Sequence, residues 1–181
     1  MSKLPEFIDT RLPRHEKEIL IREILEIDRA QLSLGDYTIS QNNKKRLIAL
    51  QEKLLDGYPL QYALKKAHFL DLILEVDENV LIPRPETEIL AREALKHKNA
   101  IKILEIGVGS GCISIYLATK LTAQFTATDI SPLALKVARK NAKKYNTKIK
   151  FIRSDLFDKV SGKFDLIIAN LPYGTSKQCT Y

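Results

Sequence analysis

The sequence predicts an α/β fold built on a parallel sheet, preceded by a small helical module. Two observations carry this prediction. An apolar segment runs directly into a glycine-rich turn at residues 101–111 (IKILEIGVGSG), and further short apolar segments follow it in alternation with helical patterns. Before residue 57, apolar residues instead recur at helical spacing among charges. The length of 181 residues allows one full domain, or a small domain and part of another.

Composition excludes several classes of protein. No apolar run approaches the roughly 18 residues that a membrane-spanning helix needs, and the first residues lack the apolar region of a signal peptide. The two cysteines, Cys112 and Cys179, lie far apart, and the three histidines are scattered. We therefore expect a cytoplasmic protein with no metal site and no membrane contact. The sequence does not indicate an oligomeric state.

Charge is distributed unevenly along the chain. Residues 1–90 hold 13 Lys and Arg against 16 Asp and Glu, whereas residues 91–181 hold 16 against 6. The basic excess is densest at residues 136–150. One interpretation is proximity to RNA or the ribosome. The other, which we favour, is a solvated helix face, because the segment shows no repeated interleaving of aromatic and basic residues for base stacking.

The first elements are helical. Residues 14–31 predict an amphipathic helix, and residues 32–39 a turn. Ser40 is a suitable N-cap for a second helix that runs to about Leu55, and Gly57 follows its end. This pattern predicts a small helical module whose residues serve packing.

A hairpin and a proline-rich corner follow the module. Residues 69–76 and 79–82 predict two strands joined by a turn at residues 77–78. The segment Pro83-Arg84-Pro85 then stops regular structure, and a helix starts near Thr87. The corner is either a linker with a helix cap or a rigid wall beside an active site.

The glycine-rich turn follows a buried strand and opens a helix. Gly107, Gly109 and Gly111 allow a sharp turn and close approach of a ligand to the backbone. A dinucleotide fingerprint would need glycine at Cys112, so a dehydrogenase is disfavoured. With Glu105 in front, the pattern E-x-G-x-G-x-G resembles motif I of S-adenosylmethionine (SAM)-dependent methyltransferases. The alternative is simple turn chemistry.

Two further strands are predicted to end in acids. Residues 125–129 form a strand that ends at Asp129, where a carboxylate would reach the ribose hydroxyls of a nucleotide. Alternatively, Asp129 caps the helix that opens at residues 131–132. Residues 148–153 form the next strand, followed by Asp155 and Leu156. These two resemble the adenine-contacting residues of class I methyltransferases, although Asp155 could equally be an ordinary loop acid.

A fourth strand, at residues 164–169, delivers the segment Asn170-Leu171-Pro172-Tyr173. This segment resembles the [D/N]-P-P-[Y/F] motif of methyltransferases that act on planar nitrogens. An amide nitrogen is a poor nucleophile, so the chemistry needs acceptors that hold its NH₂ group in line with the methyl donor. The Asn170 side chain and the next backbone carbonyl would supply them, and Tyr173 would stack on the flat group. The alternative is a turn.

Two more segments carry a resemblance to a family. Residues 57–62 (GYPLQY) and 81–88 (LIPRPETE) are similar to the HemK/PrmC family of release-factor glutamine methyltransferases, and the order of segments matches along nearly the whole chain. The resemblance implies a class I SAM-dependent, Rossmann-like methyltransferase fold and a peptide chain release factor as substrate. It implies a cofactor site formed by Glu105, Gly107, Val108, Gly109, Ser110, Gly111, Asp129, Asp155, Leu156 and Asn170. It implies catalytic and substrate-binding roles for Asn170, Leu171, Pro172 and Tyr173, with Pro83, Arg84 and Pro85 beside the substrate.

The expected domains are a helical substrate-recognition domain at residues 1–66, a hairpin linker at 67–86 and a partial methyltransferase domain at 87–181. The family's sheet has about seven strands and four are placed here, so we expect an incomplete domain with an exposed sheet edge. Leu171 stands where the family usually has proline, and Asn-Leu-Pro-Tyr also resembles the ribosomal RNA adenine dimethyltransferases. A nucleic-acid adenine methyltransferase and an inactive remnant therefore remain alternatives.

Overall fold

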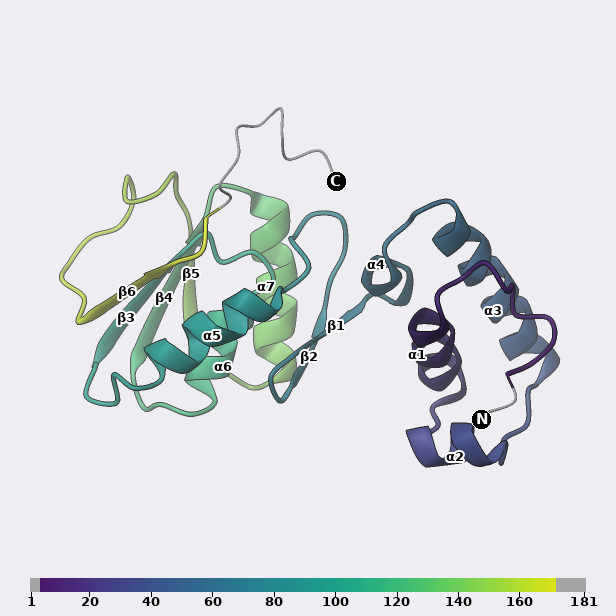
Figure 1. Ribbon diagram of the computed structural model, residues 1–181. Coiled ribbons are helices and arrows are strands. Elements are labelled where there is room, and N and C mark those ends of the chain that lie inside the picture. The colour runs from purple at the N-terminus through teal and green to yellow at the C-terminus, as the bar shows by residue number, and fades with distance from the viewer. Residues whose placement is uncertain (1–3, 172–181) are drawn as a thin grey trace. The chain divides into compact units, whose positions relative to one another are not determined.

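The computed structural model describes residues 4–171, and the chain divides into two units, Met1–Lys65 and Lys66–Tyr181 (Figure 1). The first unit is helical and the second contains both sheets. The hairpin belongs by its contacts to the second unit.

From residue 4 onward, the first unit contains four helices, α1 (Arg14–Leu25), α2 (Arg29–Leu34), α3 (Gln41–Leu55) and α4 (Leu60–Leu64). Their apolar faces enclose one core, in which Leu20, Ile21 and Leu47 are fully buried. The predicted N-cap of α3 is confirmed, because Ser40 Oγ accepts a hydrogen bond from Asn43 N at 3.2 Å.

The prediction of one helix over residues 14–31 is wrong. Glu26 adopts a left-handed conformation with φ 56°, and its N–H bonds back to the Arg22 carbonyl, which ends α1. A separate helix, α2, then starts within the segment predicted to be helix and runs on into the predicted turn. Asp28 caps α2, accepting from Gln31 N at 2.8 Å, and Gln31 returns a bond to Asp28 N. The apolar periodicity continues across this break, so it hides the break from the sequence.

The predicted hairpin exists, but its position was wrong. The strands are β1 (Lys66–Phe69) and β2 (Leu72–Glu75), antiparallel with Phe69 opposite Leu72. The turn therefore lies at Leu70-Asp71, within an apolar run that predicts a single strand, and residues 79–82 form no strand. Leu70 has φ 52°, and its N–H donates to Glu88 Oε1 at 3.0 Å. A distant side chain thus stabilises a turn that lacks the usual turn residues.

The second unit is built on a parallel sheet whose strand order is β5-β4-β3-β6. Its strands are β3 (Lys102–Ile106), β4 (Gln124–Asp129), β5 (Ile149–Arg153) and β6 (Leu166–Ala169). The chain moves outward from β3 through β4 to β5 and then returns to the other side of β3. The loops after β3 and β6 thus leave from the point where strand order reverses, which is the usual ligand crevice of such sheets.

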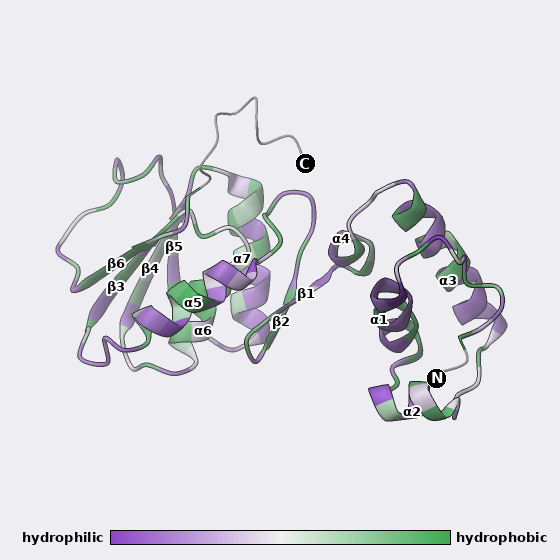
Figure 2. Cartoon of the chain, in the orientation of Figure 1, coloured by the Kyte–Doolittle hydropathy of each residue, from purple (hydrophilic) through white to green (hydrophobic). Residues whose placement is uncertain are grey.

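The helices α5 (Pro85–Ala94), α6 (Cys112–Ala118) and α7 (Pro132–Lys144) pack on one face of this sheet. The same face carries Ile103, Phe125 and Ile168, which lie in one core cluster with α5 and α6. Figure 2 shows α7 with both apolar and polar surfaces, and its apolar residues Leu135 and Ala138 pack on the sheet. The structure confirms the predicted α/β fold with a parallel sheet.

Strand β6 is an edge of the sheet within the described residues. Its Ile167 is 50% exposed. At the start of β6, the Asp165 side chain accepts from Ile101 N at 2.9 Å and Lys102 N at 2.8 Å, which ties β6 to β3 at their N-terminal ends. Within residues 4–171, no helix is long and apolar enough to cross a membrane.

Candidate functional site

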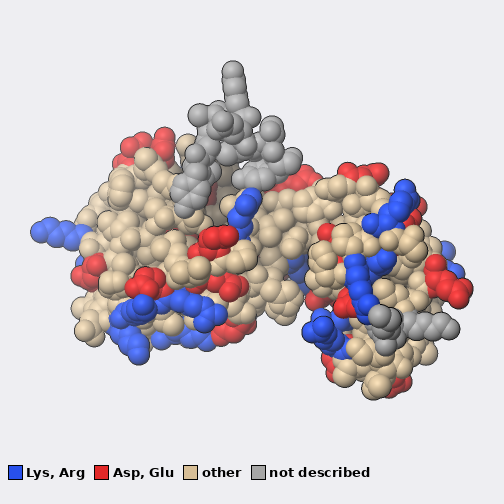
Figure 3. Space-filling view, viewed as in Figure 1, with Lys and Arg blue, Asp and Glu red and all other residues tan. Residues whose placement is uncertain are grey.

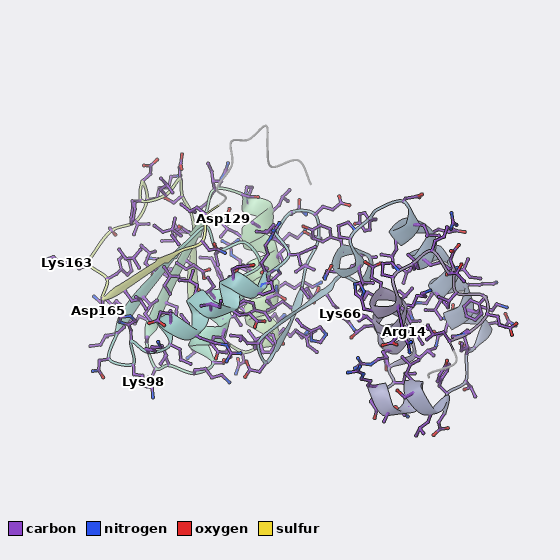
Figure 4. The ribbon with its side chains drawn as sticks, viewed as in Figure 1. Arg14, Lys66, Lys98, Asp129, Lys163 and Asp165 are labelled. Carbon is purple, nitrogen blue, oxygen red and sulfur yellow. The ribbon has the colours of Figure 1, made fainter. Side chains whose placement is uncertain are left out.

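The carboxyl ends of the parallel strands β3, β4, β5 and β6 meet at one edge of the sheet. Ile106 of β3 lies opposite Thr128 of β4 and Ala169 of β6, and Asp129 lies opposite Arg153 of β5. The residues that follow these strands are therefore neighbours along this edge. Figure 4 shows Asp129 at this edge and Asp165 at the opposite end of the sheet.

The glycine loop requires glycine for different reasons at its three positions. All three have positive φ: 72° at Gly107, 52° at Gly109 and 85° at Gly111. An added Cβ at Gly111 would lie 2.7 Å from Ile115 Cδ1, and one at Gly107 would lie 2.7 Å from Leu171 Cδ2. A Cβ at Gly109 would meet no described atom within 4 Å. The backbone at Gly109 is therefore open on the side where a ligand could approach.

A buried acid supports the loop from beneath. Glu105 is only 2% exposed, and its Oε2 accepts from Ser114 N at 2.8 Å, in the first turn of α6. Burial raises the pKa of Glu105 to about 8, with a smaller contribution from the charge of Asp129. Val108 and Ser110 are also buried, and Val108 N bonds Thr128 O at 2.9 Å. These residues fix the shape of the loop through packing and backbone bonds.

Asp129 connects the loop to the start of α7. Its Oδ2 accepts from Gly109 N at 2.9 Å, and its Oδ1 accepts from Ser131 N at 2.9 Å. The N-cap of α7 is Ser131, whose Oγ accepts from Ala134 N at 3.2 Å. Asp129 thus braces the backbone before the helix but does not cap it. A carboxylate has about four acceptor positions, so the two bonds leave capacity for hydroxyl groups.

The turn after β5 carries the next predicted residues. Asp155 is exposed, and Leu156 is 48% exposed with φ 41°. Two apolar residues that the sequence reasoning missed lie at the same edge: Ile130, 61% exposed after β4, and Phe157, 54% exposed after β5. An apolar residue directly after a strand-ending acid is the signal that could have identified Ile130, and Phe157 stands two residues after Asp155.

Asn170 follows β6 and contacts the proline-rich corner. Its Nδ2 donates to Thr87 Oγ1 at 2.9 Å, although the two residues are 83 positions apart. Leu171 is 36% exposed and lies beside Gly107. The predicted catalytic residues Pro172 and Tyr173 lie outside the described residues. The structure therefore brings Asn170 together with the glycine loop and with Thr87, which was missed as a site residue.

The corner itself is the start of α5. Pro85 is the first helical residue and Arg84 is the N-cap, without a side-chain cap bond. Pro83 is half-buried, while Arg84 and Pro85 are exposed. Thr87 is 5% exposed and faces Asn170, whereas Glu88 holds the hairpin turn. The polar pair Thr87-Glu88 after the prolines was the available signal for these contacts.

The strand order of the parallel sheet and the glycine loop after β3 define the class I methyltransferase fold. A T. thermophilus 16S rRNA methyltransferase in complex with AdoMet and guanosine aligns with a TM-score of 0.53 at 20% identity, covering 61% of this chain and 33% of that one. A Pyrococcus abyssi tRNA methyltransferase in complex with S-adenosyl-L-homocysteine aligns with a TM-score of 0.52 at 22% identity, covering 59% and 28%. These likenesses concern the fold alone.

Residues 85–181 match the family described as "Methyltransferase small domain", and residues 7–64 match the "PrmC N-terminal domain". The chain belongs to the HemK/PrmC family of methyltransferases, as the sequence motifs predicted. Relatives named "Release factor glutamine methyltransferase" include those of Lactococcus lactis, 41% identical over 87% of this chain, and Chlorobaculum tepidum, 38% identical over 89%. The chain spans about 60% of the length of each of these relatives.

Proposed function

We propose that this chain binds SAM at the carboxyl edge of its sheet and methylates the side-chain amide nitrogen of a glutamine in a peptide chain release factor. The observation that carries the proposal is the meeting of three features at the point where strand order reverses: the open loop at Gly109, the Asp129 carboxylate and the Asn170 amide. The names of the relatives supply the substrate class.

The residues present suit SAM. Gly107, Gly109 and Gly111 would pass beneath the methionine and ribose, with Glu105, Val108 and Ser110 keeping the loop in shape. Asp129 would accept bonds from the ribose hydroxyls with its remaining lone pairs. Asp155 would accept from the adenine amino group, and Leu156 would pack against the ring. The exposed Ile130 and Phe157 would extend this apolar wall. When bound, SAM supplies an electrophilic methyl group.

The protein's contribution to the reaction is mainly positioning. Asn170 Oδ1 and the following backbone carbonyl would accept hydrogen bonds from the glutamine NH₂ group, which stabilises the positive charge that develops on its nitrogen. Pro172 and Tyr173 would enclose the flat amide, and Leu171 would pack between this segment and Gly107. Pro83, Arg84 and Pro85 would form a rigid border, since two of the three have a fixed φ. No strong base is needed, because methyl transfer leaves the amide nitrogen positively charged, and this cation is acidic enough to lose a proton to water.

The wider partners follow from the same proposal. The first unit would help to bind the release factor, in the cytoplasm where translation ends. Proximity to RNA has weaker support: on the face shown in Figure 3, basic side chains gather along the lower edge of the second unit, but acidic side chains lie directly beside them. Against an RNA substrate stands the match to the PrmC N-terminal domain.

Calorimetric titration with S-adenosylhomocysteine tests the cofactor site. We expect micromolar affinity for the chain and at least tenfold weaker binding by Asp129→Ala, because a charge-assisted hydrogen bond contributes about 1.5–3 kcal/mol. Asp158→Ala is the matched control, an exposed acid in the turn after β5. A folded chain that binds no S-adenosylhomocysteine contradicts the proposal.

Transfer of radiolabelled methyl groups then tests the substrate. We expect label on a purified, unmethylated peptide chain release factor, at a glutamine side chain. Label on ribosomal RNA in place of the release factor would support the adenine methyltransferase alternative. Cofactor binding without transfer to either would contradict the assigned substrate but leave the cofactor site intact.

A further inference from the structure

The bond between Thr87 and Asn170 has a consequence for the orientation of the Asn170 amide. A primary amide has a donor end, the NH₂ group, and an acceptor end, the oxygen. The two ends are nearly equal in size, so packing alone distinguishes them poorly, and a rotation of the terminal torsion exchanges them. A hydrogen bond from a neighbour to one end leaves the other end facing the site. Because a threonine hydroxyl can donate as well as accept, exchange of the amide N–H protons is the readout that distinguishes the two orientations.

In the structure, the donor end of Asn170 faces Thr87. Nδ2 donates to Thr87 Oγ1 at 2.9 Å, and no other hydrogen bond to this side chain forms within residues 4–171. Asn170 itself is half-buried. The Asn170 side-chain oxygen is therefore the end left for an incoming group. This oxygen accepts hydrogen bonds, and a substrate NH₂ group donates them.

Thr87 is well fixed for this purpose. It is the third residue of α5 and 5% exposed, and its N–H bonds the Arg84 carbonyl at 3.0 Å. A branched side chain in a helix has few χ1 choices. The next residue, Glu88, anchors the same turn of α5 to Leu70 N at 3.0 Å. The hydroxyl therefore has a defined position, set by the helix start and not by Asn170.

We propose that Thr87 is a positioning residue that holds the Asn170 amide with its oxygen toward the substrate nitrogen. Thr87 acts through Asn170 and does not contact the reacting atoms. The proposal rests on the methyl transfer proposed above, and it explains what the corner Pro-Arg-Pro-Glu-Thr contributes to a site formed by a strand 83 residues away in sequence. It also predicts a preference for substrates with an NH₂ group over substrates that present only an acceptor.

Nuclear magnetic resonance decides the orientation without any need for activity. In the ¹⁵N-labelled chain, we expect one Asn170 side-chain N–H to exchange slowly with solvent. Thr87→Val, which removes the hydroxyl but preserves shape, should abolish this protection and shift both signals. Thr87→Ser should retain it. The control is Thr119→Val, since the Thr119 hydroxyl donates to the Tyr116 carbonyl at the end of α6. Unprotected Asn170 protons in the unmodified chain would overturn the proposal, whatever the variants do.

Steady-state kinetics then tests whether Thr87 contributes to methyl transfer. With a release factor as methyl acceptor, Thr87→Val should lower kcat about three- to tenfold, the loss expected for one hydrogen bond. KM should change less than twofold, Thr87→Ser should restore kcat, and Thr119→Val should not lower it. An unchanged kcat in Thr87→Val would overturn the positioning role. A chain that transfers no methyl group but shows Thr87-dependent protection would contradict the proposed function and leave the orientation of Asn170 established.

Discussion

The side-chain amide of Asn141 forms hydrogen bonds with both backbone groups of Glu75. Glu75 N donates to Asn141 Oδ1 at 2.7 Å, and Asn141 Nδ2 donates to the Glu75 carbonyl at 2.9 Å. Tyr145 does the same for Ile73, accepting from its N–H at 2.6 Å and donating to its carbonyl at 2.9 Å. Four residues along a helix rise about 6 Å, and two residues along a strand rise about 6.6 Å. Asn141 and Tyr145 are therefore spaced to match Glu75 and Ile73. Their side chains satisfy the free backbone groups of β2, as the backbone of a third strand would.

The same amide reaches the glycine loop. Asn141 Nδ2 also donates to the Ser110 carbonyl at 2.9 Å, and Asn141 is fully buried. One side chain therefore ties the hairpin and the loop to α7. The position of the hairpin and the shape of the candidate cofactor loop depend on the same residue.

Replacing Asn141 with alanine should destabilise the second unit. The change removes this partner from the part-buried backbone groups of Glu75 and from the buried Ser110 carbonyl, and each unpaired buried group costs about 1–3 kcal/mol. We expect a loss of about 2–4 kcal/mol in the free energy of unfolding, measured by denaturant titration with circular dichroism. Asn99→Ala, at an exposed turn, is the control. A loss no greater than that of the control would show that the backbone groups find other partners.

Alanine substitutions in the glycine loop should separate packing from ligand approach. Gly111→Ala should cost most stability, because its Cβ meets the fully buried Ile115 and lies 3.4 Å from Ala138 Cβ. Gly107→Ala should cost less, because the half-exposed Leu171 can move. Gly109→Ala should cost only about 1–2 kcal/mol of stability, because a residue with a Cβ must then adopt the left-handed conformation. The same change should weaken S-adenosylhomocysteine binding.

Thermal unfolding and calorimetric titration of the three variants give these two rankings. The stability order would be refuted by Gly109→Ala unfolding at a lower temperature than Gly111→Ala. Unchanged affinity in Gly109→Ala would place the ligand away from this glycine.

The buried Glu105 should make stability depend on pH. Its pKa is about 8 in the folded chain, against an ordinary 4.5, so the folded state binds this proton more tightly than the unfolded state. The stabilisation is full below pH 4.5 and is lost as pH rises through about 8. Glu105→Gln keeps an acceptor for Ser114 N but has no charge to bury.

The free energy of unfolding of Glu105→Gln, relative to the original chain, should therefore rise between about pH 5 and pH 9 by at most about 5 kcal/mol. Denaturant titrations at several pH values measure this difference, with the exposed Glu86→Gln as control. Parallel pH profiles for Glu105→Gln and the original chain would exclude a protonated Glu105 in the folded state.

Cys112 should resist thiol reagents in the folded chain. It is 8% exposed, and the pKa of its thiol is raised to about 12. Burial is the main cause of this rise, and the charge of Glu105 is the second cause. Because the thiolate is the reactive form, alkylation near neutral pH should be about a thousandfold slower than for a free thiol. A Cys179→Ser background isolates Cys112, and the unfolded chain gives the reference rate. Equal rates in both states would mean that the start of α6 opens readily.

Local pattern was sufficient for most of the second unit. The strands β3 to β6, the glycine loop and helix α7 follow from apolar runs of strand length, from glycines with positive φ and from a serine cap. All of these act over a few neighbouring residues. Pattern was misleading where apolar residues continue through a break, at Glu26 and at Leu70. Each break depends on a left-handed residue, and at Leu70 also on a bond from the distant Glu88.

The candidate site shows the same division. Sequence motifs predicted Gly107, Asp129 and Asn170 as site residues, because parallel strands deliver their carboxyl ends to one edge. They could not predict that Thr87 orients Asn170 or that Asn141 holds both Glu75 and Ser110. These bonds join residues 31 to 83 positions apart. Such contacts form only when helices α5 and α7 pack on the sheet, so they follow from the geometry of packing and leave no periodic trace in the chain.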